Sequence, residues 1–270
     1  MKMEIEGVNY HIELMNEDKE QALVFLHGFT GSTKTWHKIV PRFEEYKIVL
    51  IDLLGHGGTD SPKDPERYSM EQQMRDLEKI FDHLGLTNFA LAGYSMGGRT
   101  ALAYACEFPG RLSSLLLESS SPGLKTEEQR SERRKNDGRL AERITSGGII
   151  SFVDSWEKIP LFRTQHALSK HVKAEVREER LAQNPIGLAN SLIGMGTGAQ
   201  KSYWETISQL QIPVLLVTGK LDEKFTAIAK EMVSLMPNAE HSEIIAGHAL
   251  HVEKPAEFAT IVWEYLKKNF

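Results

Sequence analysis

Gly93-Tyr94-Ser95-Met96-Gly97 is the stretch that decides the fold of this chain. Residues 88–92 before it are mostly apolar and lead into glycine, which predicts a short buried strand. Residues 98–106 after it are rich in alanine and suit a packed helix. A serine between two glycines on a strand-to-helix turn is typical of a nucleophile elbow, a strained turn that lifts the hydroxyl clear of the sheet. We therefore interpret Ser95 as a nucleophile, with the N–H groups at the helix start facing any negative charge that develops beside it.

Strands and helices alternate along the rest of the chain. Continuous apolar runs, which are typical of strands buried on both faces, occupy residues 22–26, 48–51, 112–117 and 212–219. Other patterns predict helices over 69–84, 226–236 and 255–268, a strand near 242–245 and a hairpin over 3–15. This order predicts an α/β fold with a mostly parallel, doubly wound sheet, which binds its ligands at the carboxyl ends of the strands.

The character of the sequence changes at Pro122-Gly123. Nine of the residues from 125 to 137 are charged, and no buried-strand pattern returns before about residue 209. We therefore expect a helical lid over residues 123–205, inserted into a core made of residues 1–122 and 206–270.

Composition and charge set limits on the partners. The formal net charge of −5 gives no electrostatic case for nucleic acid or an anionic membrane surface. No apolar run has the length of a membrane span, residues 1–16 lack the apolar core of a signal peptide, and the single cysteine permits no intrachain disulfide. We expect a cytoplasmic protein, a monomer or small homo-oligomer, that binds a small molecule and neither nucleic acid nor membranes.

A serine nucleophile needs a histidine base and an acid that orients the base. Asp222 and His248 follow Ser95 in the chain order serine, acid, histidine, and each comes soon after a predicted strand. We therefore predict that Ser95, Asp222 and His248 form a catalytic triad. The alternatives at the acid and base positions are Glu223, Glu118 and His251.

Three other histidines have weaker cases. His27 and His56 precede Ser95 in the chain, so we interpret them as loop-stabilising residues. His241 is expected to precede its strand and so to lie at the wrong end of the sheet. No grouping of residues has the spacing of a metal site or a P-loop, so no metal is expected.

Together these motifs resemble the α/β-hydrolase superfamily over nearly the whole chain. They are His27-Gly28-Phe29, Gly55-His56-Gly57-Gly58, the elbow with Gly98-Arg99, Asp222 and Gly247-His248. More narrowly, the chain resembles the 2-succinyl-6-hydroxy-2,4-cyclohexadiene-1-carboxylate synthases of menaquinone biosynthesis. The features shared with these synthases are Arg99 after the elbow, Glu118 with Pro122-Gly123-Leu124, Asp222-Glu223-Lys224-Phe225, and Gly247-His248-Ala249 with His251 and Glu253.

The resemblance implies an α/β-hydrolase fold with a helical lid, and a lyase that needs neither a metal nor an organic cofactor. The implied substrate, 2-succinyl-5-enolpyruvyl-6-hydroxy-3-cyclohexene-1-carboxylate, carries three carboxylates, and the triad would remove a ring proton so that pyruvate leaves. The oxyanion hole of this fold would use the N–H groups of Met96 and Phe29. By similarity, the substrate-binding residues are Tyr94, Arg99, Arg133, Trp156 and Arg180.

The residues alone leave two other functions open. An ester or thioester hydrolase would use the same triad and would depend little on the arginines of the lid. A non-catalytic binding protein could keep the fold without the reaction. The arginines between residues 130 and 135 also fit a solvated helix surface.

Overall fold

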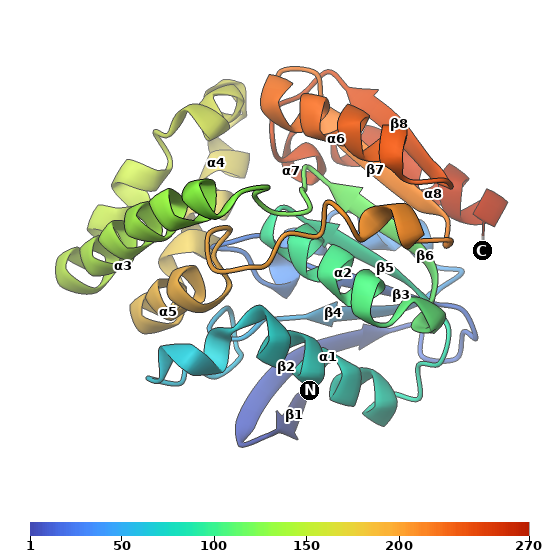
Figure 1. Cartoon of the computed structure of the whole chain (residues 1–270), viewed down its shortest axis with the longest axis horizontal. Coiled ribbons are helices and arrows are strands. Elements are labelled where there is room, and N and C mark those ends of the chain that lie inside the picture. The colour runs from blue at the N-terminus through green and yellow to red at the C-terminus, as the bar shows by residue number, and fades with distance from the viewer. Residues whose placement is uncertain (270) are drawn as a thin grey trace.

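The computed structural model describes residues 1–269 of the chain. Within them, eight strands form one sheet in the order β1-β2-β4-β3-β5-β6-β7-β8 (Figure 1). The β1–β2 and β2–β4 pairs are antiparallel, and every other pair is parallel. The mostly parallel sheet predicted from the sequence is thereby confirmed.

The elements of the described chain have the following bounds. The strands are β1 (Lys2–Ile5), β2 (Val8–Met15), β3 (Ala22–Leu26), β4 (Lys47–Ile51), β5 (Phe89–Tyr94), β6 (Leu112–Glu118), β7 (Val214–Gly219) and β8 (Ala239–Ile244). The α-helices are α1 (Met70–His83), α2 (Met96–Glu107), α3 (Glu127–Trp156), α4 (Lys170–Leu181), α5 (Pro185–Met195), α6 (Glu223–Leu235), α7 (Leu250–Glu253) and α8 (Pro255–Asn269). Short 3₁₀ helices are η1 (Thr33–Trp36), η2 (Val40–Phe43), η3 (Pro65–Tyr68), η4 (Pro109–Arg111), η5 (Pro160–Ala167) and η6 (Ile207–Gln209).

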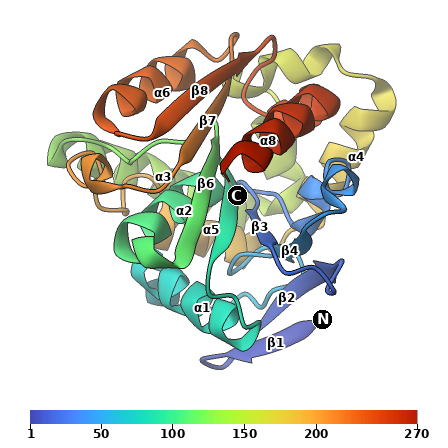
Figure 2. The same cartoon turned by 90° about the vertical axis from the view of Figure 1, so that its right-hand side faces the viewer.

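Apolar side chains cover both faces of the sheet. One core cluster includes Val24 and Leu91 and packs against α1, α2 and α6. The other includes Phe25 and Ala92 and packs against η1, η2 and α8. Figure 2 shows α1, α2 and α6 on one side of the strands and α8 on the other. Because neighbouring residues of a strand point to opposite faces, burial on both faces explains the uninterrupted apolar runs.

The chain between β6 and β7, within the described residues, forms helices and no strand. The charged run becomes the first turns of α3, where the Thr126 hydroxyl caps the helix by accepting from the Gln129 N–H. Ala141 of α3 packs with Leu188 of α5 in a third apolar cluster, and α3, α4 and α5 stand together beside the sheet in Figure 1. The lid boundaries, residues 123 and 205, stay a prediction. No helix within residues 1–269 combines the length and apolarity that a membrane span requires.

Two of the element boundaries that differ from the sequence expectations change the interpretation of a residue. α6 begins at Glu223, three residues earlier than expected, so Asp222 becomes its N-cap. The expectation that His241 precedes its strand is wrong, because His241 lies within β8, opposite Leu216. β8 is the edge strand of the sheet and is only partly buried, so it lacks the continuous apolar run that marks the central strands.

The approach of α2 to β3 gives a test of the fold. A Cβ on Gly97 would lie 2.2 Å from the carbonyl oxygen of Leu26, closer than real contacts allow. Gly97→Ala should therefore lower the free energy of unfolding by about 1–3 kcal/mol, measured by urea denaturation. Gly138→Ala is the control: apart from the adjacent backbone of helix α3, no atom lies within 4 Å of its Cβ position, and alanine should stabilise there by about 0.5–1 kcal/mol. A Gly97→Ala protein as stable as the wild type would contradict the packing described here.

Candidate active site

Ser95 occupies a strained turn between β5 and α2. Its backbone has φ 50° and ψ −103°, in a region that residues with a side chain rarely adopt. Its N–H donates to the carbonyl oxygen of Glu118 at the end of β6, 2.9 Å away. The strain predicted for the elbow is therefore present, and it is held by the neighbouring strand.

Ser95, His248 and Asp222 form one continuous chain of hydrogen bonds. Nδ1 of His248 donates to Oδ2 of Asp222 at 2.6 Å, which leaves Nε2 as the acceptor for the Ser95 hydroxyl at 3.0 Å. His248 follows β8, and Asp222 follows β7, where its Oδ1 also accepts from the Phe225 N–H that opens α6. His248 and Asp222 are both buried. In this arrangement the imidazole can take a proton from Ser95 while the aspartate stabilises its charged form.

The alternative acid and base are paired with each other. Oε1 of Glu118 accepts from Nδ1 of His251 at 2.8 Å and from the backbone N–H of Leu250 at 2.6 Å. Both members of the Glu118–His251 pair are buried, and Glu118 thereby fixes the start of α7. Glu223 is an exposed residue in the first turn of α6. No side chain of these three residues hydrogen-bonds to Ser95 or His248 in the described chain.

His27 and His56 are buried beside the pocket and are neutral. Nδ1 of His27 donates to the carbonyl oxygen of Gly28, and its Nε2 accepts from the Leu53 N–H. Burial lowers the pKa of His27 to about 4 and that of His56 to about 3. These bonds join the loops after β3 and β4, as the loop-stabilising interpretation predicts.

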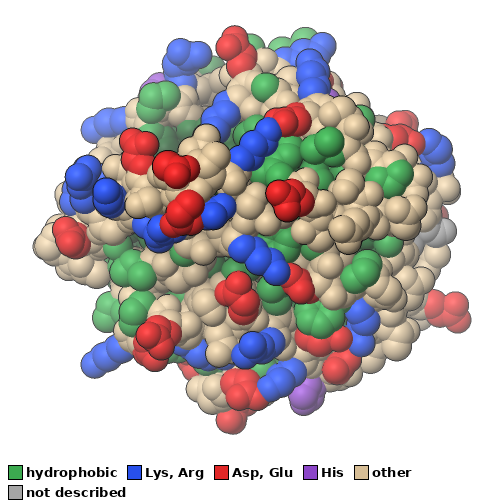
Figure 3. Space-filling model, viewed as in Figure 1, with side chains coloured by type: hydrophobic (Ala, Val, Ile, Leu, Met, Phe, Trp, Pro, Cys, Tyr) green, Lys and Arg blue, Asp and Glu red, His purple; other side chains and the backbone are tan. Residues whose placement is uncertain are grey.

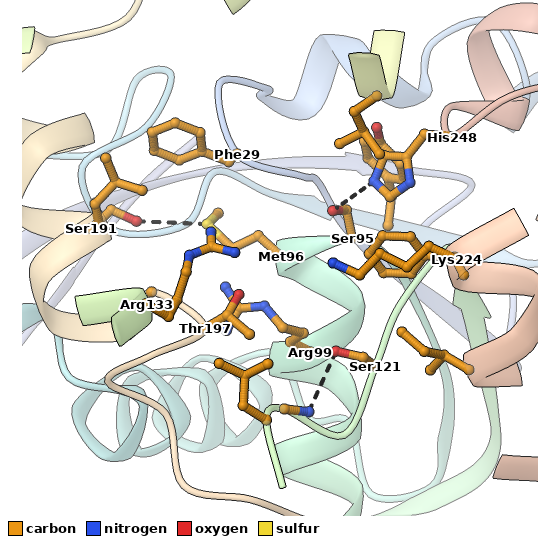
Figure 4. Close-up of a pocket in the computed structure, with 18 of the residues that line it drawn as sticks. Phe29, Ser95, Met96, Arg99, Ser121, Arg133, Ser191, Thr197, Lys224 and His248 are labelled. Carbon is orange, nitrogen blue, oxygen red and sulfur yellow. Dashed lines mark hydrogen bonds between the residues drawn. The ribbon is translucent and has the colours of Figure 1, made fainter. Parts of the chain in front are cut away.

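Two backbone N–H groups are candidates for an oxyanion hole. Met96 is the first residue of α2, so its N–H has no acceptor within the helix. Phe29 lies in the loop after β3 and lines the same pocket as Met96 and Ser95. Figure 4 shows Phe29 and Met96 on one side of the pocket and the Ser95–His248 hydrogen bond on the other. Their role as donors to an oxyanion stays a prediction.

The pocket over Ser95 is a cavity of about 240 Å³. Among the described residues that line it, three are cations and none is a carboxylate: Arg99 of α2, Arg133 of α3 and Lys224 of α6. The molecular face in Figure 3 carries interspersed basic and acidic side chains, whereas the charged residues among the described lining of the pocket are all basic. A site of this kind favours an anionic ligand with more than one charge.

Hydrogen bonds to neighbouring residues hold the side chains of Arg99 and Arg133 in place. Arg99 is buried, and its Nη1 donates to the Met195 carbonyl oxygen at 3.0 Å and to the side chain of Gln200. Burial, together with the like charge of Arg133, lowers the pKa of Arg99 to about 10, so it is still charged at neutral pH. Nε of Arg133 donates to the buried carboxylate of Asp137 at 2.8 Å. In Figure 4 its guanidinium reaches into the pocket.

The other residues expected to bind substrate are divided between two sites. Tyr94 and Trp156 line the pocket. Arg180 does not line it; its guanidinium stacks on the ring of Phe162, 4.7 Å from the centroid, and Nη2 donates to Gln165. Phe162 itself lines the pocket, so Arg180 contacts a lining residue without lining the cavity itself.

Lys224 is a site residue that the sequence does not reveal. It stands there within Asp222-Glu223-Lys224-Phe225, and no pattern in that stretch indicates that its side chain faces the serine. Because α6 starts at Glu223, Lys224 lies in the first turn, directly beside the triad. In Figure 4 its amine points into the pocket between Ser95 and Arg99. No salt bridge to Lys224 is found in residues 1–269. The same part of the chain contains no group of three or more His, Cys, Asp or Glu side chains that could hold a metal ion.

Comparison with known proteins gives one consistent family. A family model described as the alpha/beta hydrolase fold matches residues 21–255. The chain is 45% identical to a provisionally named 2-succinyl-6-hydroxy-2,4-cyclohexadiene-1-carboxylate synthase of Bacillus subtilis, over 97% of this chain and 96% of that protein. It is 32% identical to a synthase of the same name from Salmonella agona, over 87% of this chain and 89% of that protein.

Solved structures agree with these relatives. MenH from S. aureus superimposes with a TM-score of 0.92 at 38% identity, covering 96% of this chain and 98% of that one. An enol-lactonase from Burkholderia xenovorans has a TM-score of 0.86 at 19% identity, covering 99% of this chain and 100% of that one. At that identity the lactonase shows the fold alone.

The two buried histidines near Ser95 give a test of the triad. A fluorophosphonate, which modifies an activated serine, should label Ser95, and His248→Ala should slow labelling about a hundredfold or more because the base is lost. His251→Ala should slow labelling less than about tenfold, since His251 contacts Glu118 and not Ser95. Labelling is followed by intact-protein mass spectrometry, with circular dichroism as the control for folding. If His251→Ala were the more severe change, the assignment of the base would be wrong.

Proposed function

Since the chain belongs to the α/β-hydrolase fold family and, within it, to the 2-succinyl-6-hydroxy-2,4-cyclohexadiene-1-carboxylate synthases, we propose that Ser95, His248 and Asp222 carry out the reaction of those enzymes. The protein is a lyase of menaquinone biosynthesis. It eliminates pyruvate from 2-succinyl-5-enolpyruvyl-6-hydroxy-3-cyclohexene-1-carboxylate. From the geometry of the pocket we further propose a role for each residue in this reaction.

The chemistry is a proton abstraction followed by loss of a leaving group. The ring C–H next to the succinyl carbonyl is acidic, because the electron pair it leaves can spread onto the carbonyl oxygen as an enolate. That pair then returns through the ring double bond and breaks the carbon–oxygen bond to the enolpyruvyl group, which leaves as an enolate and takes up a proton to become pyruvate. The ring begins with one double bond and ends with two conjugated ones, and no bond to the enzyme forms.

The hydrogen-bonded chain at Ser95 suits a proton relay. The Ser95 hydroxyl lies between Nε2 of His248 and the pocket, so it can take the ring proton as it passes its own to the imidazole. Asp222, bonded to Nδ1, stabilises the imidazolium that results. The N–H groups of Phe29 and Met96 would donate to the enolate oxygen, a contact of the kind that contributes about 3–4 kcal/mol.

The observation that carries this proposal is the positive lining of the pocket around the Ser–His pair. Arg99, Arg133 and Lys224 are three cations for a substrate with three carboxylates, and no lining carboxylate opposes them within the described chain. Each charge-assisted contact contributes about 1.5–3 kcal/mol. Held in this way, the substrate would keep its reactive C–H beside Ser95, which removes much of the entropic cost of the reaction. A cytoplasmic location stays a prediction from the sequence.

Direct assay tests the reaction. Incubation of the enzyme with the enolpyruvyl cyclohexene substrate should release pyruvate, followed through a lactate dehydrogenase couple, in step with the absorbance of the conjugated diene. Ser95→Ala should lower kcat severely. Nitrophenyl esters should turn over slowly, since the cationic pocket fits them poorly. Fast ester hydrolysis without release of pyruvate would favour the hydrolase that shares this triad.

The cations of the pocket make a separate prediction. Arg99→Ala, Arg133→Ala and Lys224→Ala should each raise KM about tenfold or more, the equivalent of at least about 1.4 kcal/mol, because each change removes one carboxylate contact. Arg133→Lys should rescue poorly, since lysine cannot bind a carboxylate with two parallel hydrogen bonds.

Arg134→Ala is the matched control for these variants. Arg134 neighbours Arg133 on α3, but it pairs with Glu127 and the Gly198 carbonyl oxygen and lines a different groove. Its KM should stay within about twofold of the wild type. Unchanged KM in all three pocket variants would remove the proposal that these cations bind the substrate.

A further inference from the structure

Glu253 connects the helical segment between β6 and β7 to the loop that carries His248. Its Oε2 accepts from the backbone N–H of Gly247 at 2.8 Å, directly before the histidine. Its Oε1 accepts from the hydroxyl of Thr164 in η5 at 2.9 Å. The two oxygens of one carboxylate thus hold two segments that are 83 residues apart in the chain, counted from Thr164 to Gly247.

The contact between η5 and this loop is close as well as hydrogen-bonded. A Cβ on Gly247 would lie 2.0 Å from Oγ1 of Thr164 and 2.9 Å from Oε1 of Glu253. Thr164 therefore packs directly on the backbone of Gly247, and a side chain at residue 247 would have to displace it. Phe162 of the same 3₁₀ helix lies edge-on to the His248 ring, with 6.4 Å between ring centroids.

The opposite side of the His248 loop is fixed to the sheet. Glu118 at the end of β6 accepts from the N–H groups of Leu250 and His251. The histidine thus has one support in the sheet, through Glu118, and a second in η5, through Glu253. The hydrogen bond from Nδ1 of His248 to Asp222 is enough to fix the tautomer of the imidazole. The contact through Glu253 is therefore not needed to place the proton on Nδ1.

We propose that Glu253 and Thr164 are positioning residues that set the orientation of His248 according to where η5 lies against the core. The proposal rests on the assignment of His248 as the base in the proposed function. When η5 packs on Gly247, the loop is held and Nε2 faces Ser95; when that contact is lost, the imidazole has more freedom. Because Phe162 belongs to the same 3₁₀ helix and lines the pocket, its position there and the alignment of the base would then change together.

Two substitutions separate this role from simple structural support. Thr164→Val removes the hydroxyl at nearly constant volume, whereas Thr164→Ser keeps it. Glu253→Gln keeps the size of the side chain but removes its charge, and its amide nitrogen can only donate, so the Gly247 N–H and the Thr164 hydroxyl can no longer both donate to this side chain. Two controls probe the same substitutions elsewhere. Thr145→Val changes a hydroxyl that bonds only within α3, to Ala141 and Glu142, and Glu257→Gln changes an exposed carboxylate in the first turn of α8.

The kinetic readout is the division between kcat and KM in the pyruvate-release assay. Glu253→Gln should lower kcat by about ten- to a hundredfold, as expected for a misplaced catalytic group, while KM changes by less than about threefold. Thr164→Val should lower kcat in the same direction, and Thr164→Ser should restore it. The double variant Thr164→Val/Glu253→Gln should be no slower than Glu253→Gln, because the two residues act through one contact.

The second readout does not depend on the reaction. The proton between Nδ1 of His248 and Asp222 should give a low-field resonance in the proton NMR spectrum, identified by its absence in His248→Ala. Thr164→Val and Glu253→Gln should shift or broaden it, while Thr164→Ser, Thr145→Val and Glu257→Gln leave it unchanged. If no pyruvate forms in any variant but the resonance responds in this way, the proposed reaction fails and the positioning role stands.

The opposite results would overturn the proposal. An unchanged resonance and unchanged kcat in folded Glu253→Gln and Thr164→Val proteins would show that the contact does not orient the histidine. Loss of kcat in Thr164→Ser equal to that in Thr164→Val would assign the effect to packing. If the loss of kcat in the double variant equalled the product of the losses in the two single variants, Thr164 and Glu253 would act separately.

Discussion

The constraint on which the rest of the structure depends is the strained backbone of Ser95. A positive φ at a serine persists only when its surroundings hold it, and here the Ser95 N–H is bonded to β6 while α2 approaches β3 through Gly97. This turn brings the hydroxyl to the carboxyl end of the sheet. The loops after β7 and β8 end beside it, so Asp222 and His248 meet the serine from separate strands.

In our proposal, the charge of the pocket distinguishes the use of this Ser-His-Asp arrangement from that in other hydrolase-fold enzymes. A Ser-His-Asp chain in an apolar or neutral pocket suits acyl transfer, since a neutral ester needs no ionic partner. Here Arg99, Arg133 and Lys224 surround the serine in a protein whose formal net charge is −5. Two of the three cations come from the α/β core and one from α3, so the full set exists only when the helical segment lies over the sheet.

Sequence patterns predicted what depends on local periodicity and chain order, and they failed where a contact joins distant segments. The central strands, the elbow and the order of Ser95, Asp222 and His248 follow from runs of residues that can be read in sequence. The edge strand β8 is half-buried and polar, so its sequence lacks a continuous apolar run. The predicted start of the strand is for this reason too late, and His241 is wrongly placed before it. The direction of the Lys224 side chain depends on the residue at which α6 starts. The stacking of Arg180 on Phe162 depends on how α4 packs on η5.

The central claim is that the triad removes a carbon-bound proton and forms no acyl-enzyme. A single-turnover measurement of pyruvate release, with substrate carrying deuterium at the ring carbon next to the succinyl carbonyl, tests it most directly. The account predicts slower release from the deuterated substrate than from the ordinary one, because breaking that bond is part of the chemical step. Equal rates for the two substrates would contradict it.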